Sequence, residues 1–200
     1  MSKYIIKIGW LVTLTFAFLL TSCNETVVEV VTEYQKKNEA FVDLVSKDTR
    51  YKELRFLHEE YPIYYKVLAT GPAELKDEKP LQNSRVSVFL KGVIPALQLL
   101  ELDEVKALKD VTPLIAQGQV FQHKGKSPTP LRIQDKEPSG SPQLSLIKGV
   151  QIALQNMSVG DKWEVVIPWQ LGYKQYDYMG VIPGFSTLVF EVELIEILEK

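Results

Sequence analysis

The segment formed by residues 146–194 constrains the fold of this 200-residue chain more than any other, because its apolar residues follow two different periods. In its first part, apolar residues recur at the spacing of an amphipathic helix. In two later runs they alternate with other residues, as in a strand that buries one face. The helical positions are Val150, Ala153, Leu154 and Met157, and the alternating runs are Trp163, Val165, Ile167 and then Leu188, Phe190, Val192, Leu194. The segment therefore predicts one short helix followed by two half-buried strands.

Turn-forming residues separate these elements. Gly160 and Asp161 follow the helix and indicate a stop and a turn. Pro168 ends the first strand, because proline has no N–H to give to a sheet ladder. A tyrosine-rich loop follows, and residues 181–184 mark the turn before the second strand.

Read in order, the segment holds a series of short motifs. They are Leu146-Ile147-Lys148-Gly149, the helix, Met157-Ser158-Val159-Gly160-Asp161, a strand ending in Ile167-Pro168, Tyr173, Ile182-Pro183-Gly184, and Thr187 to Leu194. In this order and spacing, the chain resembles the FKBP-type peptidyl-prolyl cis–trans isomerases, the macrolide-binding immunophilin family. No single motif is specific, and the joint order of the motifs carries the resemblance, which extends back to about Tyr61.

The resemblance implies an α+β fold over residues 61–200. We expect an FKBP-like curved antiparallel β-sheet of five or six strands, wrapped around one short α-helix at residues 150–157, with an N-terminal helical extension. The residues themselves predict strands at 63–68 and 85–90, with Lys91-Gly92 closing the second, and a short strand around Leu131 and Ile133.

Residues 93–117 depart from the family, which has only a handful of residues before the motif that matches Gly118-Gln119-Val120-Phe121. Several residues here fit a helical face with an acidic side, and Pro95 and Pro113 suit helix boundaries. We therefore predict an insertion at about 93–117, formed by a helix or a long hairpin at the edge of the domain.

The N-terminal residues have the pattern of a secretory signal peptide. Lys3 and Lys7 precede an apolar run over residues 8–20, and small residues lead to Cys23. This resembles a bacterial lipoprotein cleavage site, which implies that residues 1–22 are removed and Cys23 is lipidated. We expect a cell-envelope protein anchored to a membrane, the outer more than the inner. A transmembrane anchor is the alternative, but the run is shorter than the ~20 residues needed.

Residues 23–60 are predicted to form a tether and a helical extension. Phe41, Leu44 and Val45 fall at helical spacing. The extension could act as a spacer, as a lid packed on the domain, or as the dimerisation arm that some family members have. Because the segment is short, we favour the spacer and a monomer.

The resemblance also implies a ligand site. Its catalytic residues would be Tyr173, Phe121, Ile147 and Phe190, with the Tyr173 hydroxyl and the Ile147 backbone N–H as hydrogen-bond donors. The substrate-binding residues would be Leu90, Gln122, Leu131, Leu146, Val150, Tyr178 and Ile182. Taken singly, Phe190, Leu131 and Phe121 are better explained as core and Tyr173 as a surface tyrosine on a loop, and the resemblance reverses this preference in favour of pocket lining.

The chemistry implied is rotation about X-Pro bonds, whose barrier of ~20 kcal/mol comes from amide resonance. An apolar site favours the twisted, less polar amide, so no metal or cofactor is required. Proline-containing polypeptides of the cell envelope would be the substrates, and macrolides are further expected ligands. The expected function is therefore that of a peptidyl-prolyl isomerase, or rotamase, in protein folding.

Four positions depart from the family pattern. Gln122 replaces an acidic residue, Val150 a tryptophan, Leu90 a tyrosine and Lys174 a glycine. These changes predict weakened activity, so the alternative is a catalytically weak or inactive FKBP-fold module that binds proline-containing segments.

Other functions have little support in the sequence. The net charge is −2, and no basic and aromatic patch indicates nucleic-acid binding. Only two histidines occur, without the spacing of a zinc site, and the single cysteine excludes an intramolecular disulfide.

Overall fold

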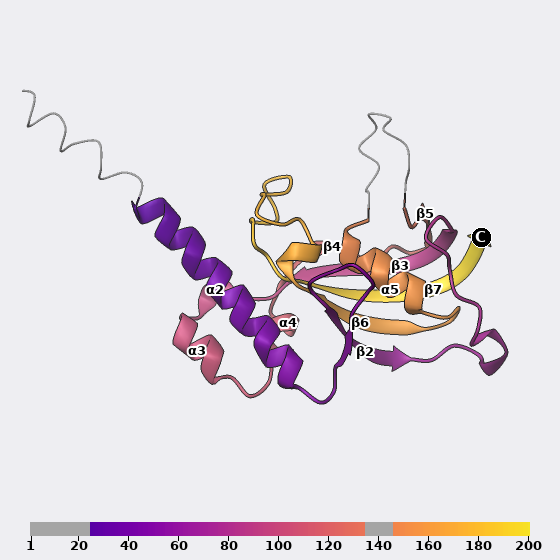
Figure 1. The fold of residues 1–200 in the computed structure, drawn as a ribbon, viewed down its shortest axis with the longest axis horizontal. Helices are drawn as coiled ribbons and strands as arrows, with labels where there is room; N and C mark the ends of the chain where they lie inside the picture. Colours follow the sequence, from indigo (N-terminus) through magenta and orange to yellow (C-terminus); the bar gives the residue numbers. More distant parts are fainter. Residues whose placement is uncertain (1–24, 135–145) are drawn as a thin grey trace, which may run out of the picture.

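The structure, a computed structural model, describes residues 25–134 and 146–200. Its helices are α2 (Glu25–Lys47), α3 (Leu102–Ala107), α4 (Thr112–Ala116) and α5 (Lys148–Asn156). Its strands are β1 (Lys52–Leu54), β2 (Ile63–Ala69), β3 (Arg85–Ile94), β4 (Gln119–Gln122), β5 (Thr129–Arg132), β6 (Lys162–Ile167) and β7 (Leu188–Glu199). The long helix α2 lies at one end of the sheet, beside α3 and α4 (Figure 1).

The strands form one antiparallel sheet in the order β1-β2-β6-β7-β3-β4, and β5 also pairs with β3. Helix α5 packs against one face of this curved sheet (Figure 1). The α+β, FKBP-like fold expected from the sequence is confirmed. Within the described residues the sheet has seven strands, because β1 joins one edge and both β4 and β5 pair with β3.

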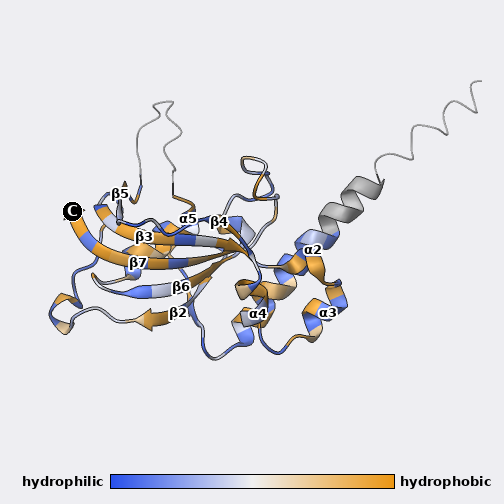
Figure 2. Cartoon of the chain, turned by 180° about the vertical axis from the view of Figure 1, so that it is seen from behind, coloured by the Kyte–Doolittle hydropathy of each residue, from blue (hydrophilic) through white to orange (hydrophobic). Residues whose placement is uncertain are grey.

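Alternate residues of the central strands enter two different cores. Val165 and Phe190 face α5 in the cluster that we call the main core, whereas Val166 and Val189 face the opposite side. Successive side chains of a strand point to opposite faces, so one strand serves both layers. Beyond Phe190, Glu191 and Glu193 lie on the same face as Val189, and the alternation of apolar and polar residues is visible along β7 (Figure 2).

Helix α2 packs on one end of the sheet face that lies opposite α5. Its fully buried residues Phe41 and Val45 pack with Tyr64, Val166 and Val189 in what we call the second core. The second core also contains residues of the insertion, namely Ala96, Leu97, Val105, Val111 and Leu114. The helical extension is thus packed on the sheet rather than held apart from it.

Two features of the insertion differ from the sequence-based expectation. Strand β3 does not close at Lys91-Gly92 but continues to Ile94. The insertion contains two short helices, α3 and α4, and a 3₁₀ turn at Leu97–Leu99, instead of one helix or a hairpin. A capping box closes the start of α3, where Glu101 and Glu104 exchange bonds between side chain and backbone.

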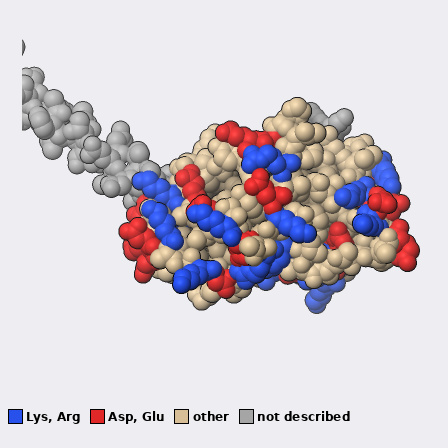
Figure 3. Space-filling view, turned by 60° about the horizontal axis from the view of Figure 1, so that its bottom comes forward, with Lys and Arg blue, Asp and Glu red and all other residues tan. Residues whose placement is uncertain are grey.

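Charged residues are spread over the surface. Lys and Arg alternate with Asp and Glu on the face shown in Figure 3. No helix within residues 25–134 and 146–200 has the length and hydrophobicity of a membrane span.

Candidate functional site

A β-bulge in β4 places Phe121 over Gly92. The register between β3 and β4 shifts between Gly92, which pairs with Gln122, and Val93, which pairs with Val120, so Phe121 is the extra residue of the bulge. A Cβ at Gly92 would overlap the ring of Phe121, and the absence of a side chain there lets the ring reach the sheet. Phe121 therefore comes from an edge strand but packs on the main core.

Phe190 lies beside Phe121. It stands on β7 opposite both Gly92 and Val165, and it is buried. The two rings meet edge to face, with centroids 5.5 Å apart and planes at 82°. This is one of the favoured geometries for aromatic pairs. Phe190 thus forms a buried wall, and the partly exposed Phe121 stands at its rim.

The loop between β6 and β7 carries two stacked tyrosines. We call residues 172–187 the site loop. The rings of Tyr173 and Tyr178 are stacked, with centroids 4.0 Å apart and planes at 18°. Burial, with a smaller contribution from the adjacent Tyr178, raises the pKa of Tyr173 to about 12. Its hydroxyl therefore keeps its proton, and can donate a hydrogen bond, at neutral pH.

A tight turn fixes Tyr178 relative to Ile182. The N–H of Val181 donates to the carbonyl of Tyr178 over 3.0 Å, while Met179 and Gly180 have φ of 52° and 66°. Positive φ at both central residues defines a type I′ turn. The N–H of Tyr178 also donates to the carbonyl of Ile182 over 2.8 Å, which leaves the side chain of Ile182 buried in the main core.

Ile147 lies at the start of α5, where backbone N–H groups lack partners within the helix. It is the N-cap residue, and no side chain caps this end of the helix. Gln151 donates to the carbonyl of Leu146 over 2.7 Å, which fixes the residues before the helix. No acceptor within the described residues receives the N–H of Ile147. A ligand carbonyl could accept it, since orphan N–H groups gather at helix N-termini.

The structure brings the apolar candidates together in one cluster. Five are buried in the main core: Leu90, Ile147, Val150, Ile182 and Phe190. Five are partly exposed and pack against it: Phe121, Leu131, Leu146, Tyr173 and Tyr178. Gln122 is half-buried on β4, and Cys23 lies outside the described residues. All ten residues thus belong to the main core or pack against it, while the functional role of each residue stays a prediction.

Two of the departures from the family lie on one face of the sheet. Leu90 and Gly92 are two residues apart on β3, and Gln122 is paired with Gly92. The side chains of Leu90 and Gln122 are therefore diagonal neighbours. A tyrosine and an acidic residue could form a hydrogen bond there, whereas leucine and glutamine cannot form the same bond.

The site loop contains structural residues that the sequence reasoning did not single out. Phe185 packs edge to face on Trp169, with centroids 4.9 Å apart, and its N–H donates to the carbonyl of Lys174 over 2.7 Å. Lys174 itself has φ of 61°. This conformation suits glycine, which explains physically why the family has glycine at this position. The departure at Lys174 was the sequence signal for this unusual backbone conformation.

Comparisons with known proteins agree with this architecture. The family model for FKBP-type peptidyl-prolyl cis-trans isomerase matches residues 76–195. The FKBP-type 22 kDa peptidyl-prolyl cis-trans isomerase of Escherichia coli K12 is 52% identical over 62 residues, which are 31% of this chain and 30% of that protein. The peptidyl-prolyl cis-trans isomerase Mip of Coxiella burnetii is 41% identical over 64 residues, 32% of this chain and 28% of that protein. The matched part thus spans less than a third of either relative.

Solved structures show the same fold over more of the chain. A peptidyl-prolyl cis-trans isomerase from Pseudomonas syringae has a TM-score of 0.56 and 26% identity, covering 82% of this chain and 94% of that one. FkpA from Escherichia coli has a TM-score of 0.60 at 21% identity, covering 100% of this chain and 74% of that one. The fold and the family match define a protein of the FKBP class. The chain belongs to the FKBP-type peptidyl-prolyl cis-trans isomerase family.

Proposed function

We propose that this protein catalyses the cis–trans isomerisation of X-Pro bonds in folding polypeptides. The observation that carries the proposal is the backbone N–H of Ile147, which no acceptor within residues 25–134 and 146–200 receives. Ile147 belongs to the main core, against which Phe121 and Tyr173 also pack. An apolar aromatic surface favours the twisted, less polar amide, and a hydrogen-bond donor beside it can hold a carbonyl group of the bound peptide. Within the described residues, no group of His, Cys, Asp and Glu could hold a metal ion, and the proposed reaction requires none.

The proposed mechanism uses each part of the site for a separate task. The rings of Phe121 and Phe190 hold the proline ring and exclude water. The N–H of Ile147 and the hydroxyl of Tyr173 donate to carbonyl groups of the bound peptide and hold them in place. As the X-Pro bond twists, it loses the resonance that causes the ~20 kcal/mol barrier. The apolar surroundings stabilise this less polar state relative to the planar amide.

A proline-isomerisation assay with Leu-Pro and Phe-Pro peptides tests the proposal on the full chain in mild detergent. The native chain should accelerate isomerisation. Tyr173→Phe should lower kcat/KM about three- to tenfold, as expected for one neutral hydrogen bond of about 1 kcal/mol. Phe190→Ala should lower kcat/KM further.

Tyr65→Phe is a matched control for Tyr173→Phe. Tyr65 also packs on the main core, but it is stacked on Trp163 and belongs to no part of the proposed site. Its activity should equal that of the native chain. A folded native chain without acceleration, or equal losses in both tyrosine variants, would contradict the proposed function.

A second candidate function is binding of proline-containing segments without strong turnover. It is favoured by Gln122, Leu90 and Val150, which replace the polar pair and the tryptophan of the family. Macrolides are proposed ligands of the same site. If the double variant Leu90→Tyr, Gln122→Asp gains activity that neither single variant has, the native departures weaken catalysis. If peptides bind to a native chain that shows no turnover, the binding module is the better description.

We further propose that the protein is a monomeric lipoprotein of the bacterial envelope, anchored at Cys23 and more often in the outer than in the inner membrane. The support is the basic, apolar and small-residue pattern that precedes this cysteine. Labelling of cells with a radioactive fatty acid should mark the native chain, and Cys23→Ser should abolish the label. A labelled serine variant would contradict anchoring at Cys23. Membrane fractionation tests the location, and light scattering tests the oligomeric state.

A further inference from the structure

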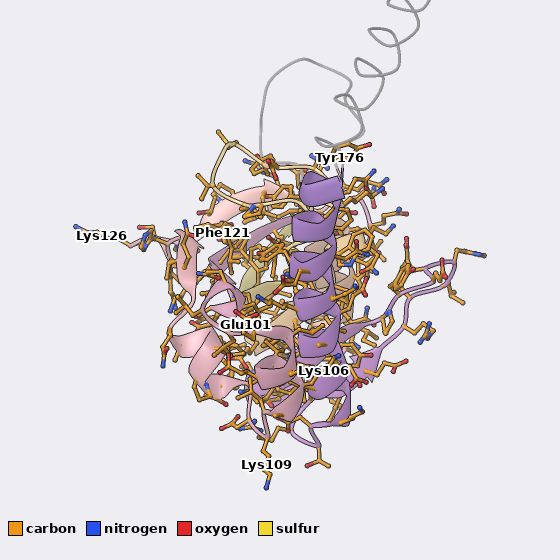
Figure 4. The ribbon with its side chains drawn as sticks, turned by 90° about the vertical axis from the view of Figure 1, so that its left-hand side faces the viewer. Glu101, Lys106, Lys109, Phe121, Lys126 and Tyr176 are labelled. Atoms are coloured by element: carbon orange, nitrogen blue, oxygen red, sulfur yellow. The ribbon has the colours of Figure 1, made fainter. Side chains whose placement is uncertain are left out.

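Helix α2 is hydrogen-bonded to the end of the site loop. Most of its buried residues pack apolar side chains into the second core, but two polar residues, Tyr34 and Asn38, contact residues 186 and 187 instead. Residues 186 and 187 join the site loop to β7, on which Phe190 lies three residues later. Figure 4 shows α2 standing against the domain, with Tyr176 of the site loop at one end of the helix.

Asn38 makes the central contact. Its side chain is fully buried and its Oδ1 accepts the N–H of Thr187 over 2.6 Å. Its Nδ2 donates to the carbonyl of Tyr34 over 2.9 Å, one helical turn earlier. The fully buried hydroxyl of Thr187 donates to the Asn38 carbonyl over 3.4 Å. A buried asparagine is costly unless its polar groups are paired, and here both ends of the amide have partners.

Tyr34 extends this contact further into the loop. The Oγ of Ser186 donates to the carbonyl of Pro183 over 2.6 Å, so it accepts from the hydroxyl of Tyr34 over 2.9 Å. Tyr34 and Ser186 thereby form a chain of hydrogen bonds from α2 to Pro183. Pro183 directly follows Ile182, which is buried in the apolar cluster of the site.

Helix α2 contacts the C-terminal part of the site loop, residues 183–187. This part is hydrogen-bonded to the N-terminal part of the loop. The N–H of Phe185 donates to the carbonyl of Lys174, next to Tyr173, and the N–H of Gly184 donates to the carboxylate of Asp177, next to Tyr178. Lys174 and Phe185 both have positive φ, at 61° and 63°. Because such conformations are costly for side-chain-bearing residues, surrounding contacts must maintain them. Contacts with α2 are among those that can do so.

We propose that Asn38 and Tyr34 are positioning residues of the isomerase site: helix α2 fixes the site loop, and through it Ile182 and the Tyr173–Tyr178 stack, in the geometry that binds the proline segment. The inference rests on the proposed isomerase function and extends it to the N-terminal helix. This role differs from that of a spacer, because substitutions in a spacer would have no effect on isomerase activity.

The test compares three variants of the full chain in mild detergent. Asn38→Leu keeps the volume but removes the acceptor for Thr187, Tyr34→Phe removes only one hydroxyl, and Asn38→Asp keeps an acceptor oxygen. Val45→Ala is the matched control, because Val45 is fully buried on α2 and belongs to the second core. Isomerase kinetics and amide hydrogen exchange at Tyr178 and Ile182 are measured at a temperature at which every variant is folded.

We expect Asn38→Leu to lower kcat/KM about tenfold and to accelerate exchange at Tyr178 and Ile182, with smaller effects in Tyr34→Phe. Asn38→Asp should recover most of both losses. Val45→Ala should lower the unfolding temperature without lowering kcat/KM, and any faster exchange should be equal at Tyr178, Ile182 and Val165, as expected of global unfolding. Unchanged kinetics and exchange in Asn38→Leu and Tyr34→Phe, or equal changes in Val45→Ala, would overturn the inference. If the native chain accelerates no substrate, the proposed function fails by itself. Loop exchange then decides alone whether α2 holds the loop.

Discussion

The ring of Phe121 occupies the space in which a side chain at Gly92 would lie. The sequence-based reading took this glycine as the end of β3, since glycine often marks a turn. The structure keeps it inside the strand, where its missing side chain admits an aromatic ring from the neighbouring bulge. Glycine in a strand commonly marks such a close approach. Glycine can thus either end a strand or make room for a neighbouring ring, and the local sequence does not distinguish the two roles.

Gly92→Ala should displace Phe121 from the wall formed by Phe190. The methyl group has no room beneath the ring, so the edge-to-face contact must open. We expect kcat/KM to fall about tenfold or more, measured by the proline-isomerisation assay. Gly125→Ala is the control: its methyl group would lie 3.1 Å from the Ser127 carbonyl oxygen in an exposed loop, and kcat/KM should not change. Full activity of Gly92→Ala would show that the position of Phe121 has no role in catalysis.

Tyr173 should make the stability of the fold sensitive to alkaline pH. Its pKa is raised by burial from 10.0 to about 12. The unfolded chain therefore releases this proton at a lower pH than the folded chain, and stability falls as the pH rises from about 10 towards about 12. Tyr51 and Tyr64 also have raised pKa values, so they contribute in the same direction.

Urea unfolding of the native chain and of Tyr173→Phe at about pH 8 and about pH 11 isolates the effect of Tyr173. Tyr51 and Tyr64 act equally in both proteins. The phenylalanine variant should lose less of its free energy of unfolding between the two pH values. Equal losses would mean that Tyr173 titrates normally in the folded chain.

The elements with strict periodicity were predictable, and those defined by distant partners were not. The alternation of Trp163, Val165 and Ile167 gave β6 directly, and the helical spacing around Ala153 gave α5. By contrast, nothing near Phe41 indicates that it packs on Val166, more than a hundred residues later. The pairing of β1 with β2 was missed for the same reason, because a three-residue strand carries almost no pattern.

The turn between α5 and β6 shows why the Met-Ser-Val-Gly-Asp motif has its form. Gly160 has φ of 89°, which glycine adopts without strain. Asp161 is buried and accepts two backbone N–H groups, from Ser158 over 2.9 Å and from Gly71 over 3.0 Å. One carboxylate thereby joins the end of α5 to the segment after β2, and fixes the helix against the sheet.

Asp161→Ala should lower the free energy of unfolding by about 2 kcal/mol or more. It leaves two N–H groups without their acceptor, and an unpaired buried donor costs about 1–3 kcal/mol. Urea unfolding measures the change. Asp161→Asn retains one acceptor oxygen and should recover part of the loss. A variant Asp161→Ala as stable as the native chain would mean that water replaces the carboxylate at both donors.

Within residues 25–134 and 146–200, two hydrophobic cores share one sheet. Val165 and Val166 are adjacent in sequence, yet the first belongs to the main core under α5 and the second to the core under α2. Phe190 and Val189 are divided in the same way. Loss of the α2 layer therefore removes support from the strands that form the floor of the proposed site. The N-terminal helix, the insertion and the FKBP-like domain should behave as one cooperative unit.

Phe41→Ala tests whether α2 and the sheet unfold as one cooperative unit. Phe41 is fully buried, so its truncation should lower the free energy of unfolding by about 3–5 kcal/mol. If the molecule is one unit, native-state hydrogen exchange should show the same loss at Val45 in α2 and at Val165 in β6. Lys36→Ala, on the exposed side of α2, should change neither by more than about 0.5 kcal/mol. A loss confined to Val45 would mean that α2 unfolds alone and that the sheet is stable without it.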